Sequence, residues 1–229
     1  NKGLIYELEL QPWFWLASKR VNSRIFHKKT VRQILAEVMG EYAAPGTRLE
    51  DKLGGNYPEL EYTVQFMETD LDFMRRMMEE FGINFHVSMA KDSHTMVLTD
   101  NNQSFPMGQT EAFDYNPNES VQILGDEYLS TMYAAQQITT GAVRMMDYNF
   151  KTSTASMEVR ESISRNYEGS GKENYEYPGR YLSASDGKEL ARRRIHGNRM
   201  PDLLAHAAGQ AISMSAGTRI KVQKHADKS

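Results

Sequence analysis

Apolar residues recur at helical spacing between residues 31 and 42. They stand three, four and seven positions apart, which places them along one face of an amphipathic helix. Thr30 can cap this helix, and Gln33 occupies the reciprocal position of a capping box. Gly40 weakens the last turn, and Pro45 ends the segment. The stripe consists of Val31, Ile34, Leu35, Val38, Met39 and Tyr42.

A second apolar stripe predicts a helix over residues 70–81. Thr69 is its N-cap, and Asp72 lies at the third helical position. Gly82 suits the left-handed residue that follows the last turn. The stripe and its neighbours are Leu71, Phe73, Met74, Met77, Met78 and Phe81. Because the methionines keep helical spacing, we interpret them as core or interface packing rather than as part of a cofactor site.

Alternation of apolar and polar residues predicts strands around these helices. Residues 60–67 alternate, and residues 83–89 and 95–99 flank a polar turn, which is typical of a hairpin. Residues 30–100 are therefore predicted to form helix, strand, helix and hairpin, one compact α+β unit. The side chains expected to be buried in it include Val64, Phe66, Phe73, Met77, Phe81 and Phe85.

The flanking regions have weaker patterns. Residues 4–16 alternate into an aromatic turn, so we expect a strand that ends at Pro12. A surface helix is expected at 186–196, and residues 201–208 fit either a short helix or an irregular strand. Further strands are expected at 120–124, 128–139, 143–150 and 219–222. Two segments show no periodicity and are expected to be loops, 44–58 and 101–118.

The chain has a lean apolar content for its length. Leu, Ile, Val and Phe together number 45 of 229 residues, close to the one-fifth level at which disorder becomes a concern. The near balance of 27 basic and 30 acidic residues argues against disorder, and 14 Met and 12 Tyr add apolar volume. We therefore expect a folded chain that buries part of its apolar surface against other segments or partner chains.

Composition excludes several classes of protein. No apolar run approaches the roughly 20 residues that span a membrane, and the mean hydropathy is −0.62. No secretory leader is visible, and the absence of cysteine excludes disulfides and thiolate metal sites. A pI near 6.1 gives no reason to expect nucleic acid as a partner. Since the sequence starts at Asn1 rather than Met, we expect a fragment of a longer protein.

Candidate catalytic groups are few. The histidines share no helix face, and only His86 and His94, on neighbouring predicted strands, could face each other. The carboxylates from Glu68 to Asp72 resemble a glycosidase pair. However, Asp70 and Asp72 fall in a first helical turn, where negative charge complements the helix dipole. We therefore interpret both aspartates as capping residues whose change to Asn costs about 1 kcal/mol or less, and expect no catalytic, cofactor or metal site.

Several longer motifs resemble VgrG proteins, the spike components of bacterial type VI secretion systems. The matching blocks lie at 24–35, 62–83, 94–100, 147–150 and 177–194. Their motif residues are Arg24, Phe26, Gln65, Phe66, Glu68, Asp70, Phe73, Gly82, Asp100, Asp147, Tyr177, Pro178 and Gly179. The family's usual Gln after the R-I-F triplet is His27 here, and residues 199–216 match poorly.

The resemblance implies a fold like that of the trimeric tail hub of contractile phages, with small β-barrels and an inserted α+β domain. It divides the chain into a strand and connector of the first barrel (1–29), the insert (30–100) and a mainly β, barrel-type region (101–229). It implies a homotrimer that caps the Hcp tube, with a PAAR tip and effectors bound through segments beyond these residues. It also implies assembly in the bacterial cytoplasm, delivery out of the cell by the secretion machine, and no enzymatic step.

Two other functions stay open from the sequence. The baseplate hub of a phage or phage-like particle shares the implied fold, so sequence separates it poorly from a secretion spike. A hydrolytic α+β domain is the third and least favoured function, since the effector domains of the resembling family lie beyond these residues. None of the three interpretations leads us to expect a cofactor, nucleic acid or a membrane span.

Overall fold

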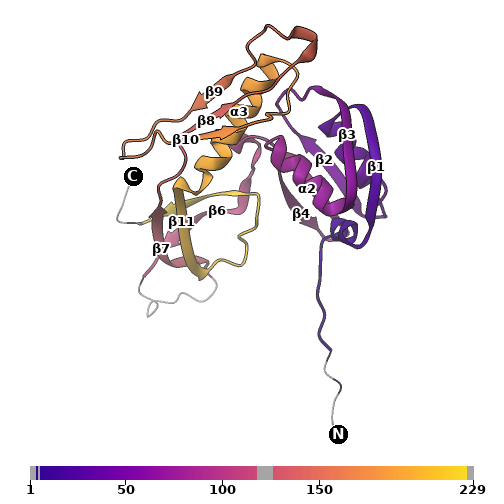
Figure 1. Ribbon diagram of the computed structural model, residues 1–229. Coiled ribbons are helices and arrows are strands. Elements are labelled where there is room, and N and C mark those ends of the chain that lie inside the picture. The colour runs from indigo at the N-terminus through magenta and orange to yellow at the C-terminus, as the bar shows by residue number, and fades with distance from the viewer. Residues whose placement is uncertain (1–3, 5, 118–125, 226–229) are drawn as a thin grey trace. The chain divides into compact units, whose positions relative to one another are not determined.

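The computed structural model describes residues 4, 6–117 and 126–225 of the chain (Figure 1). It combines mixed β-sheets with a few helices, which confirms the α+β class. None of the sheets formed by these residues closes into a barrel. None of the helices in the described part of the chain is long and apolar enough to cross a membrane.

The contacts divide the chain into two units. The first comprises the residues up to Glu79 together with Ile83–Asn102. The second comprises Glu80–Gly82 and the chain from Gln103 onward. The first unit therefore holds most of the predicted insert, and it also holds the segment that precedes residue 30.

The first unit contains two sheets and two α-helices. Its elements are η1 (Trp13–Lys19), β1 (Val21–Thr30), α1 (Val31–Gly40), β2 (Thr47–Lys52), β3 (Glu59–Thr69), α2 (Asp70–Glu80), β4 (Asn84–Ala90) and β5 (Ser93–Thr99). β1 pairs with β3 in an antiparallel sheet, and β5 lies between a parallel β2 and an antiparallel β4. Phe26 of β1 stacks on Phe73 of α2 with ring centroids 5.4 Å apart, so α2 packs against the β1–β3 sheet.

The predicted helix ends are confirmed. The Thr30 side chain accepts a hydrogen bond from the Gln33 backbone, and the Gln33 side chain accepts one from the Thr30 backbone, which completes the capping box. Thr69 caps α2 by accepting from the Asp72 amide at 3.0 Å. Gly82 has φ +64°, the left-handed conformation that favours glycine after a helix.

Two strands of the first unit lack a periodic signal in the sequence. β1 lies in the segment interpreted as a connector, yet it pairs along its length with β3. β2 falls within the expected loop 44–58, where Leu49 is the only apolar residue of the strand. An edge strand exposed to water needs no apolar face, so its sequence shows no alternation of apolar and polar residues. β2 is therefore recognised only in the structure, by its parallel ladder with β5.

Residues of β3 alternate with the predicted period of two, but the apolar side chains point to solvent and two polar ones to the interior. Val64 and Phe66 are 38% and 70% exposed, whereas Thr63 and Gln65 are buried. The prediction that Val64 and Phe66 belong to the core is therefore wrong. The inner face is polar because Gln65 bonds to a buried carboxylate. Of the other expected core residues, Phe73, Met77 and Phe81 are buried and Phe85 is half-buried.

The predicted strand at the start of the chain is not formed. Among the described residues before Trp13 none joins a ladder, and their apolar side chains Leu4, Tyr6, Leu8 and Leu10 are 78–90% exposed. The aromatic turn is instead the 3-10 helix η1, which buries Trp13, Phe14 and Ala17. An alternating pattern specifies a strand only when a neighbouring strand satisfies its backbone groups.

The two histidines that could have faced each other, His86 and His94, do not, and both are half-buried. In the β4–β5 ladder His86 lies opposite Val97, and His94 lies opposite Met89. The offset of the two strands therefore separates the imidazoles along the sheet. The residues that the structure describes contain no group of three His, Asp or Glu side chains arranged to hold a metal ion.

The described residues of the second unit form two further sheets and one long helix. Its elements are β6 (Met107–Tyr115), β7 (Tyr128–Gln136), β8 (Ala142–Met145), η3 (Phe150–Thr152), β9 (Val159–Ser162), β10 (Glu173–Glu176), α3 (Ala184–Arg199), η4 (Met200–Asp202), β11 (Leu203–Gln210) and β12 (Arg219–Gln223), with η2 (Asn102–Ser104) at its start. One sheet has the strand order β11-β7-β6-β12 and the other β10-β8-β9.

Several predictions for this unit are confirmed. α3 covers the predicted helix 186–196, begins at the N-cap Ser183, and packs on β8 and β9 through Leu190 and Ile195. The two alternatives for 201–208 follow one another along the chain: Pro201 lies in the short helix η4, and the strand β11 comes next.

The expected loop 101–118 is a wrong prediction, because the strand β6 lies within it.

Of the strands predicted for the second unit, two are confirmed, one is shorter than predicted, and one lies outside the described residues. The strand at 120–124 lies outside the described residues. β7 confirms the strand expected at 128–139, and β12 confirms the one at 219–222. The strand expected at 143–150 is shorter than predicted, because β8 ends at Met145 and η3 begins at Phe150.

We predict that Phe73→Ala lowers the free energy of unfolding by about 3–5 kcal/mol, because it leaves a cavity against Phe26. Phe66→Ala is the matched control: the same atoms are removed from a ring that is 70% exposed, so the loss should stay within about 1 kcal/mol. Urea unfolding of both variants measures the difference. Equal losses in the two variants would contradict the assignment of inner and outer faces.

Candidate functional site

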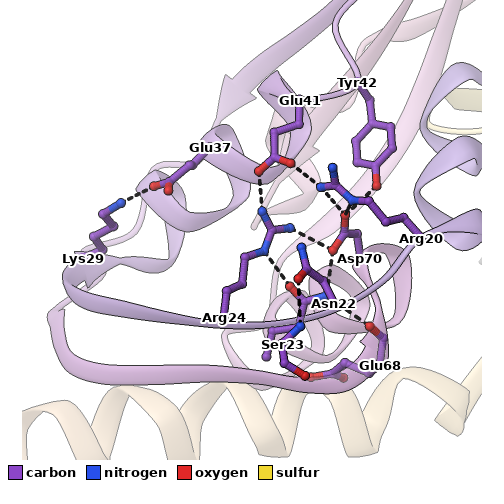
Figure 2. A network of polar contacts seen from close by, with 11 residues as sticks. Arg20, Asn22, Ser23, Arg24, Lys29, Glu37, Glu41, Tyr42, Glu68 and Asp70 are labelled. Carbon is purple, nitrogen blue, oxygen red and sulfur yellow. Dashed lines mark hydrogen bonds and ion pairs between the residues drawn. The ribbon is translucent and has the colours of Figure 1, made fainter.

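A buried carboxylate, Asp70, is the centre of a polar cluster in the first unit (Figure 2). Its side chain is fully inaccessible to solvent. Arg20 Nη2 lies 2.6 Å from Asp70 Oδ2, and Arg24 Nη2 lies 2.8 Å from Oδ1. Gln65 Nε2 donates to Oδ1 at 2.7 Å, and the Tyr42 hydroxyl donates to Oδ2. Each carboxylate oxygen therefore accepts from two side chains.

The partners of Asp70 come from separate segments of the first unit. Arg20 follows η1, Arg24 lies on β1, Gln65 on β3, and Tyr42 just after α1. Glu41, also at the end of α1, forms ion pairs with both arginines. The cluster therefore ties the start of α2 to η1, both strands of the β1–β3 sheet and the end of α1.

The electrostatics of the cluster favour its ionised form. Burial alone raises the pKa of the Asp70 carboxyl, but hydrogen bonds from Tyr42, Gln65 and Arg20 outweigh it and hold that pKa below its ordinary value. Burial and the hydrogen bond to Asp70 raise the pKa of Tyr42 to about 12. Despite burial, hydrogen bonds from Arg20 and Arg24 hold the pKa of Glu41 below its ordinary value. The charged carboxylates and the neutral phenol thus stabilise one another.

This arrangement corrects the interpretation of Asp70 as a helix cap. Thr69 provides the cap, and Asp72 is the carboxylate that bonds back to it, with its Oδ2 accepting from the Thr69 hydroxyl at 2.6 Å. Asp70 is instead paired with arginines 46 and 50 residues earlier in the sequence. Sequence periodicity reports neighbours within one helical turn and cannot detect such long-range partners.

Asp70 is also poorly suited to catalysis. A carboxylate that accepts from four side chains has no lone pair available for a substrate proton. The nearby Glu68 is engaged as well, because both of its oxygens accept from Arg76. Of the carboxylates that could have formed a hydrolytic pair, Asp70 and Glu68 are therefore committed to ion pairs, and Asp72 is bonded to Thr69.

Asp100 closes a loop at the end of β5. Its carboxylate accepts from the backbone amides of Gly54 and Gly55, at 3.1 and 2.7 Å, and from the Tyr57 hydroxyl at 2.9 Å. Burial alone raises the pKa of the Asp100 carboxyl, but these hydrogen bonds have the larger effect and hold that pKa below its ordinary value. This motif residue holds backbone in place and presents no free ligand atom.

The motif residues of the second unit form a clamp between two loops. Asp147 Oδ2 accepts from the Arg180 amide at 2.6 Å. The bond between Tyr177 and Pro178 is cis. A Cβ on Gly179 would lie 2.3 Å from the Tyr181 ring, so only glycine fits there. The Tyr181 hydroxyl donates to the carbonyl oxygens of Met145 and Met157.

A second buried ionic cluster carries no sequence signal. Arg199, at the end of α3, is buried and donates to the carbonyl oxygens of Ile163 and Ser170 and to the Tyr167 hydroxyl. Tyr167 in turn donates to Asp202 at 2.8 Å. A recess of about 440 Å³ lies beside these residues. Its charged lining residues, Arg165 and Asp202, are paired with each other at 2.7 Å.

Most of the predicted motif residues thus form hydrogen bonds, ion pairs or ring contacts between segments of the chain. Arg24, Gln65 and Asp70 meet in the Asp70 cluster, and Phe26 and Phe73 stack beside it. Phe66 stands apart from them because it points outward. Of the remaining motif residues, Glu68 pairs with Arg76 of α2, Gly82 follows the end of α2, and Asp100 and Asp147 accept hydrogen bonds from loop amides. The last three, Tyr177, Pro178 and Gly179, lie at the cis peptide bond after β10.

Comparison with solved structures identifies the fold as that of tail-hub proteins. The chain superposes with a TM-score of 0.62 on the E. coli c3393 protein, described as a component of the type VI secretion system that is structurally similar to bacteriophage T4 tail proteins gp27 and gp5. The match covers 93% of this chain and 44% of that one at 16% identity. A 43 kDa tail protein of prophage MuSo2 from Shewanella oneidensis matches with a TM-score of 0.54, 11% identity, and 86% and 57% coverage.

The chain belongs to the phage tail baseplate hub family (GPD), whose profile matches residues 2–229. Among curated proteins, it is 30% identical over 220 residues to the type VI secretion system spike protein VgrG1b of Pseudomonas aeruginosa, covering 95% of this chain and 29% of VgrG1b. It is 32% identical over 192 residues to VgrG1c of the same organism, covering 83% and 26%. The chain thus spans less than a third of the length of these relatives.

We predict that Asp70→Asn lowers the free energy of unfolding by about 3–5 kcal/mol, because it removes the charge that compensates two partly buried arginines. Asp72→Asn is the matched control, an identical change in the same helical turn. It should cost about 1 kcal/mol or less, through the cap and dipole alone. Urea unfolding measures both values, and similar losses would contradict the cluster.

We also predict a specific acid sensitivity. The folded pKa of Asp70 is depressed, so its stabilising contribution is complete above the unfolded pKa of about 3.9 and is lost as pH falls through the folded value. Below about pH 4 the wild-type protein should therefore lose stability more steeply than Asp70→Asn. Unfolding curves from pH 7 downward test this. Asp100, whose pKa is also lowered, should leave a residual slope in the variant.

Proposed function

We propose that the chain is the hub region of a spike component of a bacterial type VI secretion system. In this proposal it assembles as a homotrimer, caps the Hcp tube and is propelled with it into target cells. The observation that carries the proposal is the identity of 30% and 32% to spike proteins over 95% and 83% of the chain.

The polar ties of the first unit suit a mechanical role. A spike pushed by a contracting sheath must transmit force without local unfolding. The Asp70 cluster supports this because Arg20, Arg24 and Tyr42 reach Asp70 from 28 to 50 residues away in the sequence. The Asp70 carboxylate at its centre is inaccessible to solvent, so salt screens these contacts less than exposed ion pairs. Function then depends on shape and contact, and we propose that no chemical step takes place in these residues.

The proposed partners follow from the same role. The Hcp tube would meet the trimer end-on, and a PAAR tip and effectors would attach through segments beyond these residues. Assembly would take place in the bacterial cytoplasm, and the secretion machine would then deliver the protein out of the cell. Incubation with peptidoglycan and lipid substrates tests the absence of chemistry, because any turnover would contradict it.

A phage baseplate hub is the alternative with the same fold. The solved prophage tail protein is only 11% identical, so it supports the fold and not the function. The spike relatives are nearer in sequence, at about 30% identity. This difference favours the secretion system, and a gene neighbourhood that encodes a sheath and Hcp rather than capsid proteins would agree with it.

We predict that the natural-length protein is a homotrimer, to be measured by light scattering at micromolar concentration. Secretion should survive Asp72→Asn, which leaves the fold intact, and should fail for Phe73→Ala, which removes core packing. A natural-length protein that remains a stable monomer at this concentration would contradict the hub function. Secretion that survives in the Phe73→Ala variant would also contradict the hub function.

A further inference from the structure

The β1–β3 sheet exposes apolar side chains on the side opposite its helices. Ile25 lies opposite Val64 in the ladder, and Tyr62 and Phe66 flank Val64 at period two. Val21 and Met67 extend this surface at the bulged end of the same strands. We name these six residues the outer apolar face. Their exposed fractions are 63% for Val21, 58% for Ile25, 59% for Tyr62, 38% for Val64, 70% for Phe66 and 72% for Met67.

An amphipathic strand usually points its apolar side chains to the core and its polar ones to solvent, and β3 does the reverse. Two polar residues of β3, Thr63 and Gln65, are buried because Gln65 must reach Asp70. The apolar residues are consequently displayed to solvent, where a strand exposed to water normally carries polar side chains. A strand whose inner positions are polar and whose outer positions are apolar indicates that another surface covers the outer side.

The size of the outer apolar face fits a protein partner. Six side chains with exposed fractions of 38–72% present on the order of 600 Å² of surface, given areas of about 150–250 Å² for each aromatic ring. Patches of this size are at the upper limit for monomers. A standard interface buries about 800 Å² per partner, so the face and its rim supply one side of a subunit contact.

The second unit carries a surface of matching chemistry. Two segments, the connection from β8 into η3 and the chain from β10 to Leu182, expose large apolar residues. They are joined by hydrogen bonds from Asn149 Nδ2 to the Leu182 carbonyl at 2.8 Å and from the Tyr175 hydroxyl to Met146 Sδ at 3.8 Å. We name this surface the aromatic patch; it consists of Tyr148, Phe150, Tyr175, Tyr177 and Leu182, which are 50–75% exposed. Asp147 holds the loops together, so the rings are presented on ordered backbone, as interface anchors usually are.

We infer that the outer apolar face of one copy docks on the aromatic patch of the next copy in the assembly. A ring with three-fold symmetry needs a head-to-tail contact between two different surfaces of each chain. The outer apolar face and the aromatic patch are two such surfaces, one on each unit. This inference rests on the proposed homotrimer and names the surfaces that form it.

Thiol labelling tests the contact, because the chain has no cysteine of its own. In the natural-length trimer, the thiol of the Phe66→Cys variant should react with maleimide about tenfold or more slowly than in the diluted monomer. Met89→Cys is the control: Met89 lies on β4 and is 66% exposed, so its reactivity should not depend on concentration. Phe150→Cys should be protected in the same way as Phe66→Cys.

The outcomes separate this inference from the proposed function. If the trimer forms and the Phe66→Cys thiol reacts equally fast in both states, the inference fails and the hub function stands. Protection that persists in the monomer would assign the face to a contact within one chain and also overturn the inference. Failure to form any trimer would overturn both.

A charge on the face provides a second measurement. Phe66→Glu should shift the trimer–monomer midpoint to about tenfold higher concentration or more, because the carboxylate is buried on association. Met89→Glu should leave the midpoint unchanged. Since Phe66 contributes little to the core, circular dichroism of Phe66→Glu should match that of the wild type. An unshifted midpoint in a folded variant would contradict the docking surface.

Discussion

The burial of one carboxylate is the constraint on which the first unit depends. A charged group without access to solvent is tolerated only when its charge and its hydrogen-bonding capacity are both satisfied. For Asp70 this takes two arginines, a phenol and an amide, which come from β1, β3 and the residues that follow η1 and α1. These segments can therefore pack in one relative arrangement, and the start of α2 is held at their meeting point.

The same constraint determines the surface of the molecule. Gln65 can reach Asp70 only if the inner face of β3 is the polar one, so its apolar neighbours Val64 and Phe66 must point outward. A requirement of the interior thus leaves an apolar surface outside, which the proposed docking between copies would cover. One hydrogen-bonded side chain, Gln65, therefore determines both the interior and the exterior of this strand.

The second unit solves a similar problem with different residues. Its irregular loops have few ladder contacts, so side chains satisfy their backbone groups instead. Tyr181 donates to two carbonyl oxygens, Arg199 to two others, and Asp147 accepts from loop amides. Such ties replace part of the packing that a chain lean in Leu, Ile, Val and Phe lacks.

The sequence by itself determined the features that depend on near neighbours. The capping box at Thr30, the cap at Thr69, the left-handed Gly82 and the β4–β5 hairpin all follow from residues within a few positions of one another. Its longer motifs also indicated the family to which the chain belongs.

Only the tertiary structure decided which face of β3 is buried, whether the described residues before Trp13 join a strand ladder, and which side chains Asp70 bonds to. Periodicity gives the spacing of a strand but not the side from which its partners approach. A polar side can be the inner one when a buried charge requires it, as the Asp70 carboxylate requires Gln65. That requirement arises only once the chain has folded, because folding is what brings Arg20, Arg24 and Asp70 within hydrogen-bonding distance.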